Sequence, residues 1–196
     1  MPAMSIQHAL LTSLLEKPST GYDLARRFDK SIGYFWHASH QQIYRELGRM
    51  AEAGWIEASD DYEAGQRRRR LYQVLDAGLL ELARWVSTPE TDGDPARALL
   101  IKLRAEAVIG PHGLDRELGR LMDEHRARLA TYLEIEQRDF TADPMSTAQK
   151  LQHAVLRAGI VAEQGWLAWA EEVLPVLQER DGQARQSADA PEARRV

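Results

Sequence analysis

The chain has 196 residues, of which 44% are hydrophobic and 28% are charged, and it contains no cysteine. This composition is typical of a globular protein and excludes disulfides, thiolate metal sites and a cysteine nucleophile. The net charge of −5 arises entirely after residue 88, because residues 1–88 hold 11 basic and 11 acidic residues. The acidic balance therefore does not exclude a basic surface on the first half.

Three short helices are predicted before residue 55. Apolar residues recur at helical spacing in the first of them, which ends before Pro18 because the residue preceding a proline avoids the α conformation. Thr20 is the expected cap of the second helix and Ser39 that of the third. Gly54 is expected to end the third helix.

The hydrophobic period changes after Gly54. Residues 55–58 and 71–74 are short strand candidates, and the polar segment between them contains Gly65 and four consecutive arginines. This pattern predicts a β-hairpin with a long polar tip, followed by a fourth helix that Asp76 caps. Three short helices followed by a hairpin is the order of a winged helix-turn-helix, which we expect to occupy residues 1–88 as a DNA-binding domain.

The rest of the chain is predicted to be helical. A linker rich in Pro, Gly and Asp leads into a helical region at residues 89–180, which contains long amphipathic helices at about 113–139 and 146–178. Residues 181–196 are polar and small, and we expect them to be disordered. The predicted fold class is mainly α: a winged helix-turn-helix, with three helices and a β-hairpin wing, followed by a long-helix C-terminal dimerisation region.

The third helix carries the first group of candidate DNA-binding residues. Its apolar residues Ile43, Leu47 and Met50 face the core, whereas the opposite side is polar. Arginine bonds guanine bidentately, glutamine bonds adenine, and a helix N-terminus accepts a phosphate. The candidates are Ser39, His40, Gln41, Gln42, Tyr44, Arg45 and Arg49, with Tyr22 from the second helix. The alternative is a merely solvated helix face.

Gln41 and Arg45 are the preferred base readers among these residues. The spacing of Gln42 from Ser39 suits a capping box, which gives Gln42 a competing structural role.

The second group of candidates is the arginine run of the hairpin: Arg67, Arg68, Arg69 and Arg70. Adjacent guanidiniums repel one another, but beside a phosphate backbone they become favourable through counterion release. Alternate residues of a strand point to opposite faces, so two arginines could face DNA while two pair with Asp60, Asp61 and Glu63 or face solvent. The alternative is a charged edge that discourages aggregation between strands.

Four motifs in this order resemble PadR-type transcriptional regulators: Gly21-Tyr22-Asp23-Leu24, residues 39–47, residues 69–74 and Asp76-Ala77-Gly78. The resemblance covers roughly residues 6–88, and the remainder resembles a Vir-like C-terminal region. The chain has Leu75 where that family often has Thr and Arg70 where it often has Lys, and neither difference threatens the fold.

The resemblance implies a homodimer that represses transcription by occupying double-stranded operator DNA. It also implies that a small phenolic or planar aromatic effector could bind in a cavity near the dimer interface and cause the protein to release the DNA.

Two long amphipathic helices cannot bury their apolar stripes in a thin arm alone, and pairing with a second copy would bury them. A Trp-rich stripe suits such an interface, so the candidates for the dimer interface and a possible effector pocket are Trp166, Leu167, Trp169 and Val173. The alternative is that these residues pack only against residues 114–133 of their own chain.

Several other classes are not expected. No apolar run is long enough to span a bilayer and no secretory signal is visible, so we expect a cytoplasmic protein without a membrane partner. The six histidines lack metal-ligand spacing, and there is no phosphate-binding loop or nucleophile elbow. We therefore expect no metal, no cofactor and no enzymatic activity. A winged-helix adaptor that binds proteins instead of DNA is the alternative function, and the arginine run favours DNA.

Overall fold

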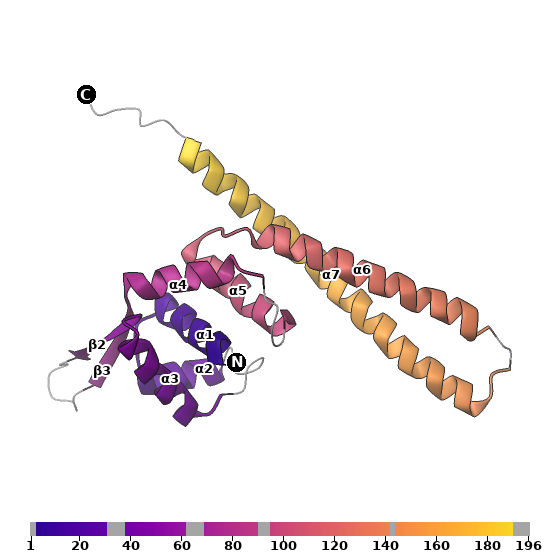
Figure 1. The fold of residues 1–196 in the computed structure, drawn as a ribbon, viewed down its shortest axis with the longest axis horizontal. Helices are drawn as coiled ribbons and strands as arrows, with labels where there is room; N and C mark the ends of the chain where they lie inside the picture. The colour runs from indigo at the N-terminus through magenta and orange to yellow at the C-terminus, as the bar shows by residue number, and fades with distance from the viewer. Residues whose placement is uncertain (1–2, 31–37, 62–68, 90–94, 142–143, 190–196) are drawn as a thin grey trace. The chain divides into compact units, whose positions relative to one another are not determined.

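The computed structural model describes residues 3–30, 38–61, 69–89, 95–141 and 144–189. The chain divides into two compact units, Met1–Leu114 and Asp115–Val196. Apart from one small three-stranded antiparallel sheet, the regular elements of the described residues are helices (Figure 1). The predicted mainly α class with a winged helix-turn-helix is therefore confirmed.

The first unit begins with three helices: α1 (Ala3–Glu16), α2 (Gly21–Asp29) and α3 (His40–Glu52). The last two begin at their predicted caps. The Asp23 N–H donates to the Thr20 hydroxyl oxygen at 3.1 Å, and the Gln42 N–H donates to the Ser39 hydroxyl oxygen at 3.2 Å. Gly54, which follows α3, has a φ of 71°, a conformation that favours glycine.

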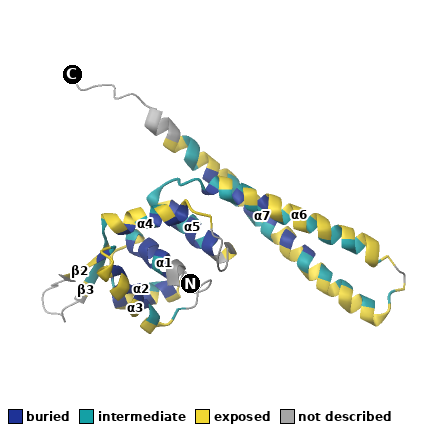
Figure 2. Cartoon of the chain, in the orientation of Figure 1, coloured by how far each residue is buried: buried dark blue, intermediate teal, exposed yellow. Residues whose placement is uncertain are grey.

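The core of the first unit draws on every one of its helices and on the base of the hairpin. Its large members, all almost completely buried, are Ile6, Leu10, Leu11, Leu14, Leu24, Phe28, Ile43, Leu47, Met50, Ile56, Leu82, Trp85, Val86 and Ile101. Because α3 contributes one whole face to this core, its opposite face is exposed (Figure 2).

The sheet consists of β1 (Ser19–Thr20), β2 (Ile56–Asp61) and β3 (Arg69–Val74), in the order β1-β3-β2. The predicted hairpin is confirmed and is longer than expected, with its register running from Ile56 opposite Val74 to Asp61 opposite Arg69. β1 was not predicted, because two residues are too few to show an alternating pattern. The hairpin tip at 62–68 lies outside the described residues.

Helix α4 (Asp76–Val86) starts directly at the base of the hairpin. The expectation that Asp76 caps it is wrong: Leu75 is the N-cap residue, without a side-chain cap, and Asp76 lies in the first turn. A carboxylate there is favourable because it faces the positive end of the helix dipole. The Leu75 N–H donates to the Trp55 carbonyl oxygen at 2.9 Å, which joins α4 to the segment before β2.

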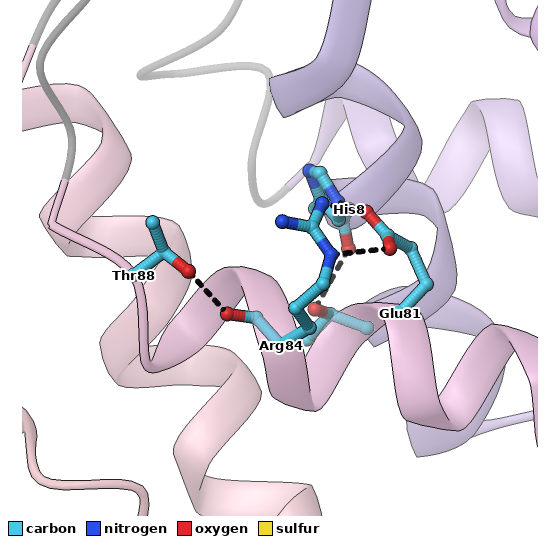
Figure 3. A network of polar contacts seen from close by, with 5 residues as sticks. His8, Glu81, Arg84 and Thr88 are labelled. Atoms are coloured by element: carbon cyan, nitrogen blue, oxygen red, sulfur yellow. Dashed lines mark hydrogen bonds and ion pairs between the residues drawn. The ribbon is translucent and has the colours of Figure 1, made fainter.

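A polar network fastens α1 to α4 (Figure 3). The ring of His8 is fully buried, lies parallel to the ring of Trp85 at a centroid distance of 4.3 Å, and places Nε2 3.2 Å from the Glu81 carboxylate. Arg84 donates to the same carboxylate at 2.6 and 2.8 Å. The hydrogen bond from Arg84 lowers the pKa of Glu81, against burial, which raises it, and the bond with His8 adds to the lowering. Glu81 is therefore held as a carboxylate between two helices.

Helix α5 (Pro95–Ile109) belongs to the first unit and packs on α1. Arg104 donates to the Glu16 carboxylate at 2.7 Å, and the buried Lys102 donates to the Thr88 carbonyl oxygen at 2.6 Å. The first unit thus extends to Leu114, beyond residue 88, where the sequence suggested the boundary. The breaker-rich segment before α5 connects two helices of one core, which local composition could not reveal.

The second unit is built from α6 (Leu114–Asp139) and α7 (Thr147–Asp189), two antiparallel helices that lie side by side (Figure 1). Two carboxylates bond side chains of the facing helix. Glu163 of α7 bonds His125 and Arg128, and Glu136 of α6 bonds His153 at 2.6 Å. Burial raises the pKa of Glu163, but the hydrogen bonds from His125 and Arg128 outweigh it, so the pKa is lowered. These contacts fix which faces of the two helices meet.

Helix α7 continues beyond the predicted end at 178. The expected disorder of residues 181–196 is wrong for 181–189, which are helical, and residues 190–196 lie outside the described residues. Gln183 donates to the Glu179 carboxylate one turn earlier at 3.3 Å, an i,i+4 interaction of the kind that stabilises a helix.

Within the described ranges, no helix is long and apolar enough to cross a membrane. The same residues contain no group of three or more His, Asp or Glu side chains arranged to hold a metal ion.

Candidate nucleic-acid interface

The polar face of α3 is the most coherent candidate surface. His40, Gln41, Tyr44, Arg45 and Arg49 are all exposed, and Gln42 is half-buried, whereas Ile43, Leu47 and Met50 on the other side are fully buried. The exposed residues span about 14 Å along the helix axis at about 1.5 Å per residue. The DNA major groove is about 12 Å wide and admits an α-helix, whose diameter with side chains is about 10–12 Å.

The start of α3 is held from two sides. Ser39 is exposed and caps the helix through the Gln42 N–H, and His40 places its Nε2 2.9 Å from the Asp29 carboxylate of α2. A phosphate at this helix N-terminus would meet favourable backbone dipoles. A phosphate there would also lie near Asp29, so His40 would have to bond the phosphate in place of the Asp29 carboxylate.

Arg45 and Arg49 converge on one carboxylate that the sequence interpretation missed. Arg49 Nη1 lies 2.9 Å and Arg45 Nε 3.4 Å from Glu46 Oε1. The two arginine side chains are 52% and 60% exposed, but the Glu46 side chain is only 1% exposed. A signal was present in the sequence, because Glu46 falls three residues after Ile43 and four before Met50, within the apolar stripe of α3.

Two predicted tyrosines flank the junction of α2 and α3. Tyr44 is 46% exposed, and its ring lies so close to Gly21 that a Cβ there would be 2.5 Å from Tyr44 Cε1. Tyr22 is 58% exposed, with the Arg26 guanidinium 5.8 Å from its ring centroid. Exposed tyrosine hydroxyls can donate to phosphate oxygens, and both side chains are exposed as the prediction requires.

Only part of the arginine run can be placed. Arg70 is exposed in β3, with its Cα opposite that of Asp60, and the backbone of Arg69 lies opposite Asp61. Arg67 and Arg68 lie outside the described residues, as does Glu63. The register sets the acidic end of β2 beside the arginines of β3, as the sequence suggested, and the wing extends from the same unit as α3.

Two of the four candidates for a dimer interface or effector pocket, Trp166 and Trp169, have aromatic contacts within the second unit. Trp166 stacks on His125 of α6 at a centroid distance of 3.6 Å, and Trp169 packs edge-on against Trp166 at 5.9 Å. Leu167 is buried and Val173 is half-buried. The stacking of Trp166 on His125 lies within the range 114–133 of the alternative, and a dimer interface at the four residues stays a prediction.

The most exposed large apolar residues of α7 lie elsewhere on that helix. They are Leu151, Val155, Val161 and Val176, of which Val155 is 76% exposed. A helix that exposes such residues still has apolar surface to bury.

Two known families account for most of the chain. Residues 10–84 match the family described as "Transcriptional regulator PadR-like family", and residues 97–178 match "Virulence activator alpha C-term". The chain is 40% identical over 189 residues to the "Probable transcriptional regulator Rv1176c" of Mycobacterium tuberculosis, covering 90% of this chain and 100% of that protein. It is 24% identical over 179 residues to the "Negative transcriptional regulator PadR" of Bacillus subtilis, covering 88% and 97% of the two chains.

Similar solved structures include two of these regulators. Bacillus subtilis PadR in complex with operator DNA is 24% identical, covers 90% of this chain and 99% of its own, and has a TM-score of 0.42. The Vibrio cholerae virulence activator AphA is 34% identical, covers 88% and 98%, and has a TM-score of 0.40. Bacillus subtilis PadR in complex with p-coumaric acid is 23% identical, covers 91% and 98%, and has a TM-score of 0.39.

Proposed function

Because this chain belongs to the PadR-like family of transcriptional regulators, we propose that it represses transcription by holding operator DNA as a homodimer. The family and the curated relatives are regulators and not enzymes. The observation that carries the proposal is α3, a capped helix that buries Ile43, Leu47 and Met50 and exposes arginine, glutamine and tyrosine side chains. Such a helix suits the major groove.

The proposed roles follow from the chemistry of each side chain. Gln41 and Arg45 read base edges, since their amide and guanidinium groups match adenine and guanine. Ser39, with the backbone N–H groups at the start of α3, takes a phosphate. The other candidates of this surface bind the DNA backbone and set its register: Tyr22, His40, Gln42, Tyr44, Arg49, Arg67, Arg68, Arg69 and Arg70.

A repressor acts by occupying the operator, and the name of the Bacillus subtilis relative, a negative regulator, supports this direction. The operator-DNA complex of that protein supports binding to a defined duplex. We place this activity in the cytoplasm, where bacterial operators are accessible.

Base reading is tested with Arg45→Ala. A preferred duplex is first selected by the wild-type protein from a randomised pool, and a shuffled duplex of equal length and composition serves as reference. The substitution is expected to weaken binding of the selected duplex about 10- to 100-fold, because a bidentate arginine contributes about 1–3 kcal/mol of discrimination. Binding of the shuffled duplex should change by less than about threefold, since phosphate contacts elsewhere dominate it.

Fluorescence-anisotropy titrations at two salt concentrations measure both affinities. Equal losses on the two duplexes would make Arg45 a phosphate contact. If the wild-type selection enriches no sequence, the DNA-binding proposal fails and a protein-binding adaptor becomes the better explanation.

The homodimer is proposed to form through α6 and α7. An isolated apolar stripe on a long helix is buried most simply by a second copy, and two winged helices must be spaced by about 34 Å to reach successive turns of DNA. Leu151 and Val155 lie one helical turn apart on α7 and are 67% and 76% exposed. They are more exposed than Trp166, which stacks on His125 of α6, and than Leu167, which is buried.

Replacing Leu151 and Val155 together by glutamate is expected to convert the dimer to a monomer, because four carboxylates would enter one apolar interface. Light scattering at micromolar concentration measures the mass, and affinity for the selected duplex should fall at least about 10-fold when two linked half-sites become independent. The exposed Gln152, also substituted by glutamate, is the matched control and should leave both unchanged. A monomeric wild type, or a double variant that stays dimeric, would contradict this interface.

A small aromatic effector is proposed to release the operator. The complex of Bacillus subtilis PadR with p-coumaric acid supports a phenolic carboxylate as the first probe, and the Trp166–Trp169 pair is the candidate pocket. Adding p-coumarate should displace labelled duplex and quench tryptophan fluorescence. If p-coumarate at millimolar concentration neither displaces the duplex nor quenches the fluorescence, this compound is removed from the proposal.

A further inference from the structure

We propose that Glu46 is a positioning residue that fixes the directions of Arg45 and Arg49 on α3 and thereby sets the base preference of the protein. This inference rests on the proposed function, that α3 reads DNA. Glu46 itself lies under the surface and is not expected to touch a base.

The carboxylate of Glu46 is buried and bonded through both of its oxygens. The Gln7 side-chain amide of α1 donates to Oε2 at 3.0 Å, whereas Arg49 and Arg45 approach Oε1 at 2.9 and 3.4 Å. A charge that is 99% shielded from solvent is costly unless such partners satisfy it. α1 therefore anchors one oxygen, and the other is presented to the exposed face of α3.

This arrangement holds two long, exposed side chains at one point. Arginine loses considerable rotamer freedom when it binds a base, and a side chain that is already held loses less. The contact uses Nε of Arg45, so the terminal amino groups, which bond guanine bidentately, are not engaged in it. The carboxylate also lets two guanidiniums lie near each other despite their repulsion.

The same carboxylate opposes DNA binding in general. It cancels one positive charge beside the phosphate backbone, which lowers the affinity for any sequence. A positioning role therefore predicts effects of opposite direction: removing the charge should lower the preference for the selected duplex without lowering affinity for the shuffled one. A merely structural role would lower both affinities together.

The experiment compares Glu46→Gln with Glu52→Gln on the selected and shuffled duplexes. Glu52 is exposed at the end of the same helix, so its substitution removes one negative charge without touching the cluster. We expect Glu46→Gln to reduce the ratio of selected to shuffled affinity about 10-fold, with the shuffled affinity unchanged or raised. Glu52→Gln should leave the ratio unchanged.

A second arm tests whether Glu46 acts through Arg45. In an Arg45→Ala background, most of the drop in the ratio caused by Glu46→Gln should disappear, since the positioned group is absent. Gln7→Met leaves the α3 surface intact and should reduce the ratio of selected to shuffled affinity about threefold. If circular dichroism shows that Glu46→Gln is unfolded, the Gln7→Met variant is the deciding test.

An unchanged ratio in a folded Glu46→Gln variant, or equal losses on both duplexes, would overturn the inference while the proposed function stands. In the fallback case, an unchanged ratio in Gln7→Met would overturn it. A wild-type protein that shows no preference between the duplexes would instead overturn the proposed function, and this inference with it.

Discussion

Replacing Arg67, Arg68, Arg69 and Arg70 together by alanine is expected to weaken DNA binding by at least about 100-fold at low salt. Each arginine that neutralises a phosphate releases counterions, and the logarithm of the affinity then falls with the logarithm of salt by about 0.9 per contact. If two of the four face DNA in each subunit of a dimer, the slope should become shallower by about 3 to 4. The loss should be similar for selected and shuffled duplexes, because phosphate contacts carry no sequence information.

Titrations between about 50 and 200 mM salt measure this slope directly. The matched control substitutes four exposed arginines of α6, which gives the same change in net charge: Arg116, Arg120, Arg126 and Arg138. The control, which light scattering must show to have the same mass as the wild type, should leave the slope nearly unchanged, since only local charge at the DNA interface releases counterions. An unaltered slope in the wing variant would remove the wing from the interface.

The features that the sequence predicted well are those decided within a few residues of the chain. Ser39 and Thr20 were identified as caps because a hydroxyl three residues before a backbone N–H can accept its hydrogen bond in almost any fold. The hairpin was identified because Ile56 and Val74 belong to β-rich runs separated by turn residues. The two faces of α3 followed from the helical period alone.

The features that it missed depend on contacts between distant segments. The two-residue strand β1 exists only because β3 pairs with it, with Ser19 opposite Tyr72. The membership of α5 in the first unit depends on the fit of Ile101 against α1 and α4, which no local pattern encodes. The sequence assigns no role to Glu46, whose partner Gln7 lies 39 positions away.

Trp166 and Leu167 show the limit of reasoning from an apolar stripe. The apolar stripe of α7 predicts a buried surface, but a stripe does not say whether it meets the same chain or another copy. His125 stacks on Trp166 from α6, so part of the stripe is occupied within the subunit. The remaining exposed part, including Leu151, is what a second copy would have to cover.

Gly78→Ala is expected to destabilise the first unit by about 3 kcal/mol, a large effect for the addition of one methyl group. A Cβ at this position would lie 2.3 Å from the Trp55 carbonyl oxygen and 3.0 Å from Val74 Cγ1. That oxygen accepts the Leu75 N–H, so relief requires α4 to move away from the hairpin base and lengthen the bond. The Asp76-Ala77-Gly78 motif thus has a physical reason: glycine permits the close approach of backbone to backbone.

Gly48→Ala is the control for Gly78→Ala, and its expected effect on stability has the opposite sign. Gly48 lies exposed within α3, and among the described residues no atom outside its chain neighbours and the surrounding backbone of α3 lies within 4 Å of an added Cβ. Gly48→Ala should therefore stabilise the protein by about 0.5–1 kcal/mol, because alanine loses less backbone entropy than glycine in a helix. Urea unfolding followed by circular dichroism at fixed protein concentration compares the two midpoints. Equal midpoints would mean that α4 and the base of the wing are not in contact at Gly78, and the anchoring of the wing would need another explanation.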